Sequence, residues 1–536
     1  MGGRRGGLNP SRRRRLTPAF GVLLGVTLVL AGAGAVVIST AYGERPTAKR
    51  VGGNRPVNVG AGVPGDISAH NSPTVVRNPR NGSHLAVANR IDTPQFSCAL
   101  HTSRDGGATW RQAAIPVPRG EEPKCYAPDV AYGADGTLYL SFVTLQGRGN
   151  VPSAAWLSRS VDGGRTLSRP VKLLGPLSFQ VRLIADPETA GRLYITWLRV
   201  SEVGLYQFSE TGNPIMFRRS DDGGRTWGSS TRVSAPSRQR AVAGSLAVGP
   251  GRELYVLYLD LAGDRLDYEG AHGGRGGDPY SGRWQLVLSR STNGGETWSE
   301  ALVEERLVPT ERFIVFIPPF PSLAVDRGSG RLYAGFQDGQ LGDADVWVWA
   351  SGDGGASWKE PTRVNDTQPQ DRTTQYLPKL AVAPNGRLDA VYYDRRRDGL
   401  DKQNEVSLQS SFDGGKSFTK RLTLSERPFD SQIGLGSERD LPDLGNRLGA
   451  VVTDTGTLAI WTDTRDGTEA SNKQDIAEAV VAFSQPAQLS ELLKHGLRYG
   501  GIALALAGGL AFLYASLRHR ALRASAPSPA TKQHPS

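Results

Sequence analysis

The chain reads Ser-Arg-Asp-Gly-Gly-Ala-Thr-Trp over residues 103–110, and five variants of this octamer follow it. The third position of each copy is an acid or its amide, at intervals of 57, 60, 71, 60 and 60 residues. These positions are Asp105, Asp162, Asp222, Asn293, Asp353 and Asp413. A short oxygen-bearing side chain accepts backbone N–H groups in a tight turn, and paired glycines supply positive φ. A period near 60 residues indicates stacked or radial supersecondary units.

Apolar residues alternate with polar ones between the octamers, in pairs of short runs separated by turns. Seven such pairs occur, over Thr74–Ala88, Val130–Phe142, Leu183–Trp197, Leu246–Tyr258, Leu323–Phe336, Leu380–Tyr393 and Leu448–Trp461. This alternation predicts antiparallel hairpins. We therefore predict an all-β fold over residues 45–485, a propeller of four-stranded sheets with seven blades favoured over six. The seventh unit has no octamer, so we expect Arg55–Gly62 to donate its missing strand and close the ring.

Both ends of the chain carry an uncharged apolar run beside a basic tail. Ala19–Ile38 holds 20 residues without a charge, and Gly500–Leu517 holds 18. These lengths predict membrane helices at 16–40 and 498–518; a cleaved signal peptide is the alternative for the first and a buried core helix for the second. The basic tails, 1–15 and 519–536, place both termini in the cytoplasm and the propeller on the extracytoplasmic side.

The formal net charge of +11 comes from these ends. The residues from 16 to 485 hold 51 basic and 51 acidic side chains, so no general basic footprint remains and nucleic acid is excluded as a partner. The two cysteines, Cys98 and Cys125, fall in the segment predicted to lie outside, where a disulfide would persist. A pair of buried free thiols is the alternative.

The octamers resemble those of the Asp-box (bacterial neuraminidase repeat) β-propellers, the superfamily that includes the exo-α-sialidases. The resemblance covers roughly residues 70–465 and implies that the octamers hold turns away from the substrate. It also implies a carboxylate-binding arginine at Arg90 and an acid/base at Asp92. Asn71 stands where that family has the arginine of an Arg-Ile-Pro motif. No tyrosine lies between Tyr393 and Tyr499, so the nucleophile's role falls to Tyr392 or Tyr393.

Loops that follow the second strand of each blade converge on one end of a propeller channel, which makes their polar residues candidates for binding. The candidate substrate-binding residues are Arg90, Arg199, Asp338, Asp394, Arg395, Asp463 and Arg465. Such a ring of Asp and Arg suits an acidic sugar or a peptide. We expect no cofactor, and the alternative is a calcium ion among the carboxylates. The alternative is a polar network that ties the blades together. The insertion Gly263–Gly282 is either a rim of this site or a mobile loop.

Three functions fit these features. The first is recognition of glycans or proteins at the cell surface by a membrane-anchored propeller, without turnover. The second is an exo-α-sialidase or another divergent glycoside hydrolase, with Asp92 as acid/base, Tyr393 as nucleophile and an arginine clamp around the substrate. The third is an assembly or scaffold factor for the cell envelope.

Overall fold

The computed structural model describes residues 18–41, 46–202, 210–264, 280–310, 320–434, 444–484 and 491–524. The chain forms two compact units, one over Ala48–Phe483 and one made of the two ends, up to Thr47 and from Ser484. The larger unit is all-β and the smaller one holds the two helices, α1 (Pro18–Ala41) and α2 (Glu491–Ala524).

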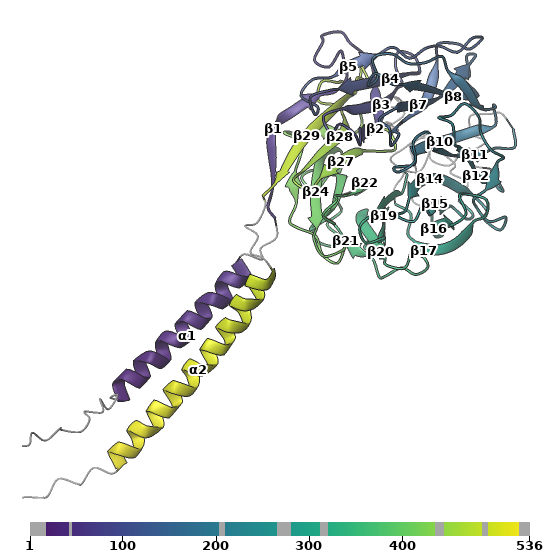
Figure 1. The fold of residues 1–536 in the computed structure, drawn as a ribbon. Helices are drawn as coiled ribbons and strands as arrows, with labels where there is room; N and C mark the ends of the chain where they lie inside the picture. Colours follow the sequence, from purple (N-terminus) through teal and green to yellow (C-terminus); the bar gives the residue numbers. More distant parts are fainter. Residues whose placement is uncertain are drawn as a thin grey trace, which may run out of the picture. The chain divides into compact units, whose positions relative to one another are not determined.

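Seven antiparallel sheets form the larger unit, which confirms the predicted seven-bladed propeller (Figure 1). The first three blades consist of β2 (His70–Arg77), β3 (Leu85–Ile91), β4 (Ser97–Ser103), β5 (Arg111–Ala113); β6 (Cys125–Tyr132), β7 (Leu138–Gln146), β8 (Val151–Ser160), β9 (Val171–Leu174); and β10 (Ser178–Ala185), β11 (Leu193–Arg199), β12 (Ile215–Ser220), β13 (Thr231–Arg232).

The last four blades complete the ring. They consist of β14 (Ala241–Val248), β15 (Leu254–Asp260), β16 (Trp284–Ser291), β17 (Ser299–Leu307); β18 (Ser322–Val325), β19 (Leu332–Asp338), β20 (Asp345–Ser351), β21 (Thr362–Arg363); β22 (Gln375–Val382), β23 (Leu388–Asp394), β24 (Gln403–Ser411), β25 (Leu422–Thr423), with β26 (Phe429–Asp430) beside β24; and β27 (Gly449–Thr453), β28 (Gly456–Asp463), β29 (Asp475–Phe483), β1 (Ala48–Pro56). Second strands such as β15 and β23 are buried along their whole length, because neighbouring blades cover both faces.

The N-terminal strand β1 closes the ring by pairing antiparallel with β29 as the outermost strand of the seventh blade. The closure was predicted, but the strand begins at Ala48 and ends at Pro56, so it shares only Arg55 and Pro56 with the expected segment. A register shift between Val51 and Arg55 accommodates two glycines. An outermost strand faces solvent on one edge, so it needs little of the apolar alternation that marks inner strands.

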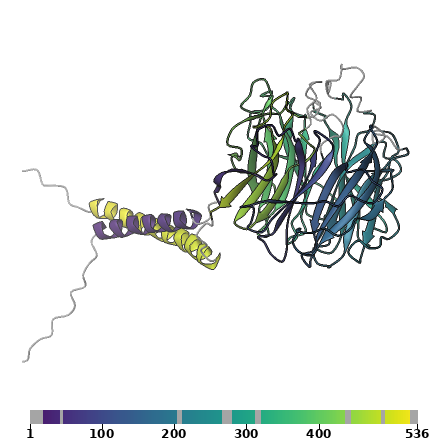
Figure 2. The same ribbon diagram turned by 90° about the horizontal axis from the view of Figure 1, so that it is seen from above.

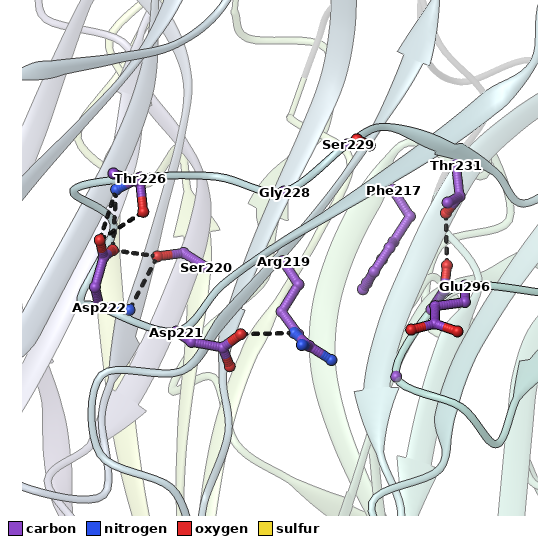
Figure 3. Close-up of a pocket in the computed structure, with 12 residues that line it drawn as sticks. Phe217, Arg219, Ser220, Asp221, Asp222, Thr226, Gly228, Ser229, Thr231 and Glu296 are labelled. Carbon is purple, nitrogen blue, oxygen red and sulfur yellow. Dashed lines mark hydrogen bonds and ion pairs between the residues drawn. The ribbon is translucent and has the colours of Figure 1, made fainter.

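All six octamers form the same hydrogen-bonded turn. In the third blade, Ser220 Oγ donates to Asp222 Oδ1 at 2.9 Å, and the backbone N–H of Thr226 donates to the same oxygen at 2.9 Å (Figure 3). Donation by Thr226 is the main cause that lowers the pKa of Asp222 to about 2. A hollow of about 390 Å³ separates this turn from the next octamer, but the turn's carboxylate is already occupied by its own chain.

The second glycine of each octamer rests on the preceding blade. A Cβ at Gly224 would overlap Leu157 of the second blade, and one at Gly295 would overlap Phe217 of the third. Trp298 of the fourth blade's octamer also packs edge-on against Phe217, with ring centroids 5.2 Å apart. The octamers therefore join neighbouring blades.

The smaller unit is an antiparallel pair of helices, and α1 and α2 lie side by side in both views (Figure 1, Figure 2). Their contact is built on glycine: a Cβ at Gly508 would lie 2.6 Å from the backbone oxygen of Gly25, and one at Gly501 would lie 2.8 Å from that of Gly32. Among the described residues, one helical stretch, His495–Ala521, is long and apolar enough to cross a membrane. The apolar stretch described in α1, Val22–Val36, is shorter, so the structure supports one of the two expected spans by length and composition.

Candidate functional site

The loops after the second strands lie at the end of the propeller opposite to the octamers. This follows from the antiparallel order of each blade, in which octamers connect the third strand to the fourth. We call the end that carries the second-strand loops the mouth face. It holds the residues that the sequence predicts to bind substrate.

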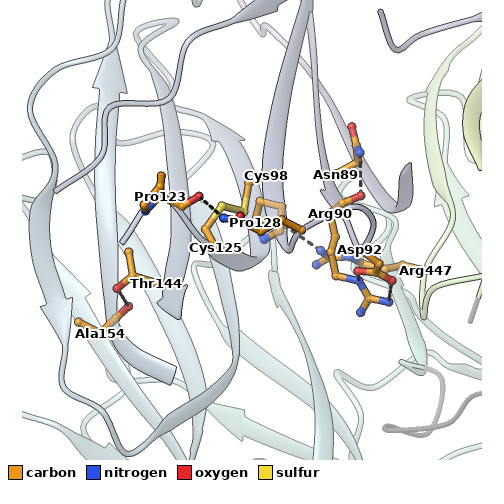
Figure 4. The surroundings of a disulfide bond; sticks show 11 residues. Asn89, Arg90, Asp92, Cys98, Pro123, Cys125, Pro128, Thr144, Ala154 and Arg447 are labelled. Carbon is orange, nitrogen blue, oxygen red and sulfur yellow. Dashed lines mark hydrogen bonds and ion pairs between the residues drawn. A yellow bond between two sulfur atoms is a disulfide. The ribbon is translucent and has the colours of Figure 1, made fainter. Parts of the chain in front are cut away.

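Arg90 and Asp92 lie together at the mouth face, at the end of β3 (Figure 4). Arg90 Nε lies 2.6 Å from Asp92 Oδ1, and Arg90 Nη2 donates to Oδ2 at 2.8 Å. Asn71 Nδ2 donates to the same Oδ2 at 2.7 Å. All three side chains are buried. The predicted carboxylate ligand, Arg90, thus already binds a carboxylate of its own chain, and Asp92 has no open position toward a substrate.

A disulfide between Cys98 and Cys125 joins the first blade to the second close to this pair (Figure 4). Cys98 lies opposite Arg90 in the pairing of β3 with β4. The residue after Cys125 is Tyr126, whose ring centroid lies 5.2 Å from the Arg90 guanidinium carbon. The disulfide therefore ties together the two strands that flank Arg90.

Tyr393 lies in the core between the sixth and seventh blades, fully buried. Its hydroxyl donates to the backbone oxygen of Thr462 at 3.1 Å and accepts the backbone N–H of the same residue. Burial raises its pKa well above the usual value. Tyr393 is therefore not part of the site proposed below.

Asp394 and Arg395, which the sequence predicts to bind substrate in the sixth blade, are bound by neighbouring side chains. Asp394 accepts Arg396 Nε and Ser407 Oγ, each at 2.8 Å. Arg395 donates to Ser431 Oγ at 2.9 Å and to Asn404 Oδ1 at 3.1 Å. Both predicted residues are buried, and their contacts stabilise the loop that connects β23 to β24.

Asp463 and Arg465 form a similar local pair in the seventh blade. Arg465 Nη2 lies 2.7 Å from Asp463 Oδ2, and Trp461 Nε1 donates to the same oxygen at 3.0 Å. Arg465 Nη1 also donates to Asn54 Oδ1 on the closing strand, at 3.2 Å. These contacts fit the alternative to a substrate-binding ring, a polar network that connects strands and blades.

Asp338 ends β19 and is buried, and no cation among the described residues forms an ion pair with it. Its Oδ1 accepts the backbone N–H groups of Gln340 at 3.0 Å and of Val308 at 3.1 Å. Burial is the main cause that raises its pKa to about 7, and the carboxylate of Glu304 raises it further. Asp338 is therefore a destabilised carboxylate in the folded propeller at neutral pH.

We expect Asp338→Asn to stabilise the propeller at pH 8 and to have little effect at pH 4. A folded-state pKa of about 7, against 3.8 for the ordinary side chain, means that stability falls as pH rises through this window. An asparagine keeps the accepting oxygen and removes the buried charge. The gain at pH 8 is on the order of 2–4 kcal/mol, measured as the unfolding free energy across pH.

The matched control for this prediction is Asp222→Asn, which should behave in the opposite way. The pKa of Asp222 is lowered to about 2, so its contribution is present at neutral pH and lost on acidification. The octamer at Asn293 shows that an asparagine fits this turn. Equal pH profiles for wild type and Asp338→Asn would contradict the prediction.

Arg199 differs from the other predicted residues because it is exposed, in a groove of about 500 Å³ between the second and third blades. The end of β9 and the connection from it to β10 form one side, and side chains of β11 and β12 form the other. Lys172, Arg199 and Arg218 are the charged residues of the lining, which has no acid. The lining also includes Trp197, which is buried with its ring centroid 5.9 Å from the Arg218 guanidinium carbon. The groove has the volume of a small-ligand site and an excess of positive charge.

The remaining expectations concern the long insertion and metal binding. Residues 265–279 of the insertion lie outside the described residues; of its described part, Asp264 accepts Trp284 Nε1 at 3.1 Å. Within the described part of the chain, no group of three or more His, Cys, Asp or Glu side chains is arranged to hold a metal ion.

Three cations that the sequence patterns did not single out lie on the central axis: Arg182, Lys379 and Arg447. Arg182 and Lys379 each follow a register shift in the inner strand of their blade, and these shifts interrupt the alternation that sequence reasoning follows. A proline precedes the equivalent position in four blades, at Pro73, Pro128, Pro321 and Pro378, and this signal would have marked Lys379 but neither Arg182 nor Arg447.

No protein-family profile and no curated protein sequence matches this chain. Several solved structures are similar. A protein of unknown function from Dyadobacter fermentans is 14% identical, with a TM-score of 0.46 over 82% of this chain and 100% of its own. The Hadza microbial sialidase Hz136 is 14% identical, with a TM-score of 0.40 over 74% of this chain and 76% of its own. The α-L-arabinanase of Penicillium chrysogenum, also 14% identical, has a TM-score of 0.40 over 70% of this chain and 97% of its own. At these identities the similarity concerns the propeller fold alone.

Proposed function

We propose that this chain is a membrane-anchored, extracytoplasmic propeller that binds acidic glycans at its mouth face and does not hydrolyse them. The observation that carries the proposal is the open groove beside Arg199, which offers three cations and no acid. Guanidinium groups bind carboxylates and sulfates through paired hydrogen bonds.

The residue predicted as the acid/base of hydrolysis, Asp92, is already bound within the protein, which supports binding without turnover. Both oxygens of Asp92 are bound by Arg90, and Asn71 donates to one of them as well. The cavity at the channel mouth, lined by Arg90, Tyr126 and Arg447 among others, measures only about 20 Å³. A sugar ring does not fit this volume, so the groove is the better place for a glycan.

The anchoring part of the proposal rests on apolar side chains that α2 exposes. Leu506, Leu510 and Tyr514 are each more than 60% exposed, which is unfavourable in water and favourable in lipid. A disulfide in the propeller and basic tails beyond both helices fit an extracytoplasmic propeller with cytoplasmic termini.

The test is binding of the full-length protein, in detergent micelles, to a panel of sialylated, sulfated, uronic-acid and neutral oligosaccharides. We expect binding to acidic members only, weakening as salt is added because the contacts are exposed ion pairs. Arg199→Ala should weaken binding about tenfold, as loss of one charge-assisted contact does. The same panel, as fluorogenic glycosides, should show no turnover.

Arg165→Ala is the matched control, because Arg165 is an exposed arginine on an octamer at the opposite end of the second blade. It should bind like wild type. Turnover of a sialoside that Asp92→Asn abolishes would overturn the proposal in favour of a hydrolase. Absence of binding to every acidic glycan would favour the scaffold reading instead.

A further inference from the structure

Four charged side chains from four different blades meet on the axis of the propeller. Arg182 Nε lies 3.4 Å from Asp129 Oδ2, and Arg447 Nη1 lies 3.9 Å from Asp129 Oδ1. Lys379 is electrostatically coupled to all three of these residues. Arg182 belongs to the third blade and Lys379 to the sixth, so in a ring of seven they can interact only across the central channel.

Among the residues that the structure describes, the channel charges do not balance. Asp129 is the carboxylate that faces the three cations, and it is also the acceptor of the Leu183 backbone N–H at 2.9 Å. The neighbouring Arg90 is neutralised by its own partner, Asp92. The described channel groups therefore carry three positive charges against one negative charge. All three cations are only partly exposed, with 18% of the Arg182 side chain and 10% of the Arg447 side chain accessible, and partial removal of unpaired charge from water is unfavourable.

The cations show this imbalance in their titration and in their hydrogen bonds. Burial, with Arg182 and Arg447 nearby, lowers the pKa of Lys379 to about 8. Burial, with Arg182 nearby, lowers the pKa of Arg447 to about 9. Arg182 Nη1 is buried and donates to no other described residue. Arg447 is held in place by backbone oxygens of two other blades, Ser72 at 3.2 Å and Pro128 at 2.8 Å.

We propose that the channel binds a small inorganic anion of the size of chloride beside Arg447, close to the charges of Arg182 and Lys379. The cavity beside Arg447, which Gln180 and Val181 of the Arg182 strand also line, has a volume of about 20 Å³, enough for one water-sized species and too small for an organic acid. The anion offsets positive charge that Asp129 alone does not compensate, and it connects blades that share no strand pairing. This site is separate from the glycan groove, so the anion proposal does not depend on the proposed function.

The test is thermal unfolding of the full-length protein in detergent at pH 7, with chloride raised from 0 to 200 mM against gluconate at constant ionic strength. We expect the midpoint to rise by about 2–5 °C and to saturate, as mass action at one site requires. Lys379→Met keeps the side-chain length and removes one excess charge. It should unfold above wild type without chloride and lose most of the chloride dependence.

Lys416→Met is the matched control, since Lys416 is an exposed lysine on the sixth octamer. Its chloride dependence should equal that of wild type. Crystals grown in bromide should show an anomalous peak beside Arg447. A wild-type midpoint that does not change with chloride, or a Lys379→Met variant that keeps the full dependence, would overturn the proposal.

Discussion

A glycine-serine linker of nine residues in place of β1 will abolish the cooperative unfolding transition of the propeller. β1 supplies the fourth strand of the seventh blade through six residue pairs with β29. Its Arg50 and Asn54 also donate to the backbone oxygen of Leu424, at 3.1 and 2.9 Å, so the strand holds the sixth blade as well. Without β1 the ring keeps an unpaired edge at its seam, and the blades can separate there.

One buried carboxylate, that of Glu478, lies at the seam. Arg55 Nη2 lies 2.6 Å from Glu478 Oε1, and Trp110 of the first octamer donates to the other carboxylate oxygen at 3.1 Å. Burial raises the pKa of Glu478 to about 7, against the opposing effect of Arg55. Glu478 therefore connects the closing strand, the seventh blade and the first blade at a single carboxylate.

A milder variant tests the same seam in a protein that still folds. Arg55→Met leaves Glu478 without its cation, which we expect to lower the unfolding free energy at pH 8 by on the order of 2 kcal/mol. The loss should shrink at pH 5, where a carboxyl with a raised pKa is protonated. Lys49→Met changes an exposed residue of the same strand and should have no effect.

A cooperative transition that survives replacement of β1 by the glycine-serine linker, measured by calorimetry, would contradict the closure.

The repeat structure of this fold was predictable from the sequence. For the seam, closure by an N-terminal strand was predictable, but the residues that form this strand were not. The octamers predict six turns because their hydrogen bonds are local. Those among Ser220, Asp222 and Thr226, for example, form within seven residues. The closing strand Ala48–Pro56 carries no such pattern, because an outer strand has one solvent-exposed edge and tolerates charge and glycine. Its position depends on a partner more than 400 residues away, which local patterns cannot indicate.

The site was less predictable than the fold, for a physical reason that two loops illustrate. Arginines two residues after Asp394 and Asp463 fold back onto these carboxylates, so the same spacing that resembles a binding ring forms closed local pairs. Arg199 has no acid two residues before it and remains exposed. The channel cations lie beyond local patterns altogether, because Arg182 and Lys379 meet only when the ring closes.

Gly508→Val will separate the two helices, whereas Gly509→Val will not. A Cβ at Gly508 would lie 2.6 Å from the backbone oxygen of Gly25 and 2.9 Å from Leu28 Cβ, contacts that only a shift of the helix relieves. A Cβ at Gly509 meets nothing within 4 Å. Small residues let helix backbones approach closely, and that approach supplies packing contacts in lipid, where no hydrophobic force drives helices together.

The distance between the helices can be measured with spin labels at Leu30→Cys and Leu506→Cys. Both positions are exposed, 67% and 65%, so labels there leave the contact undisturbed. The native cysteines form a disulfide and do not react. We expect one narrow distance in the otherwise unchanged protein, and a broader one, longer by about 3 Å, with Gly508→Val, as helices with larger side chains pack farther apart. Equal distributions for Gly508→Val and Gly509→Val would show that the glycines do not set the approach of the helices.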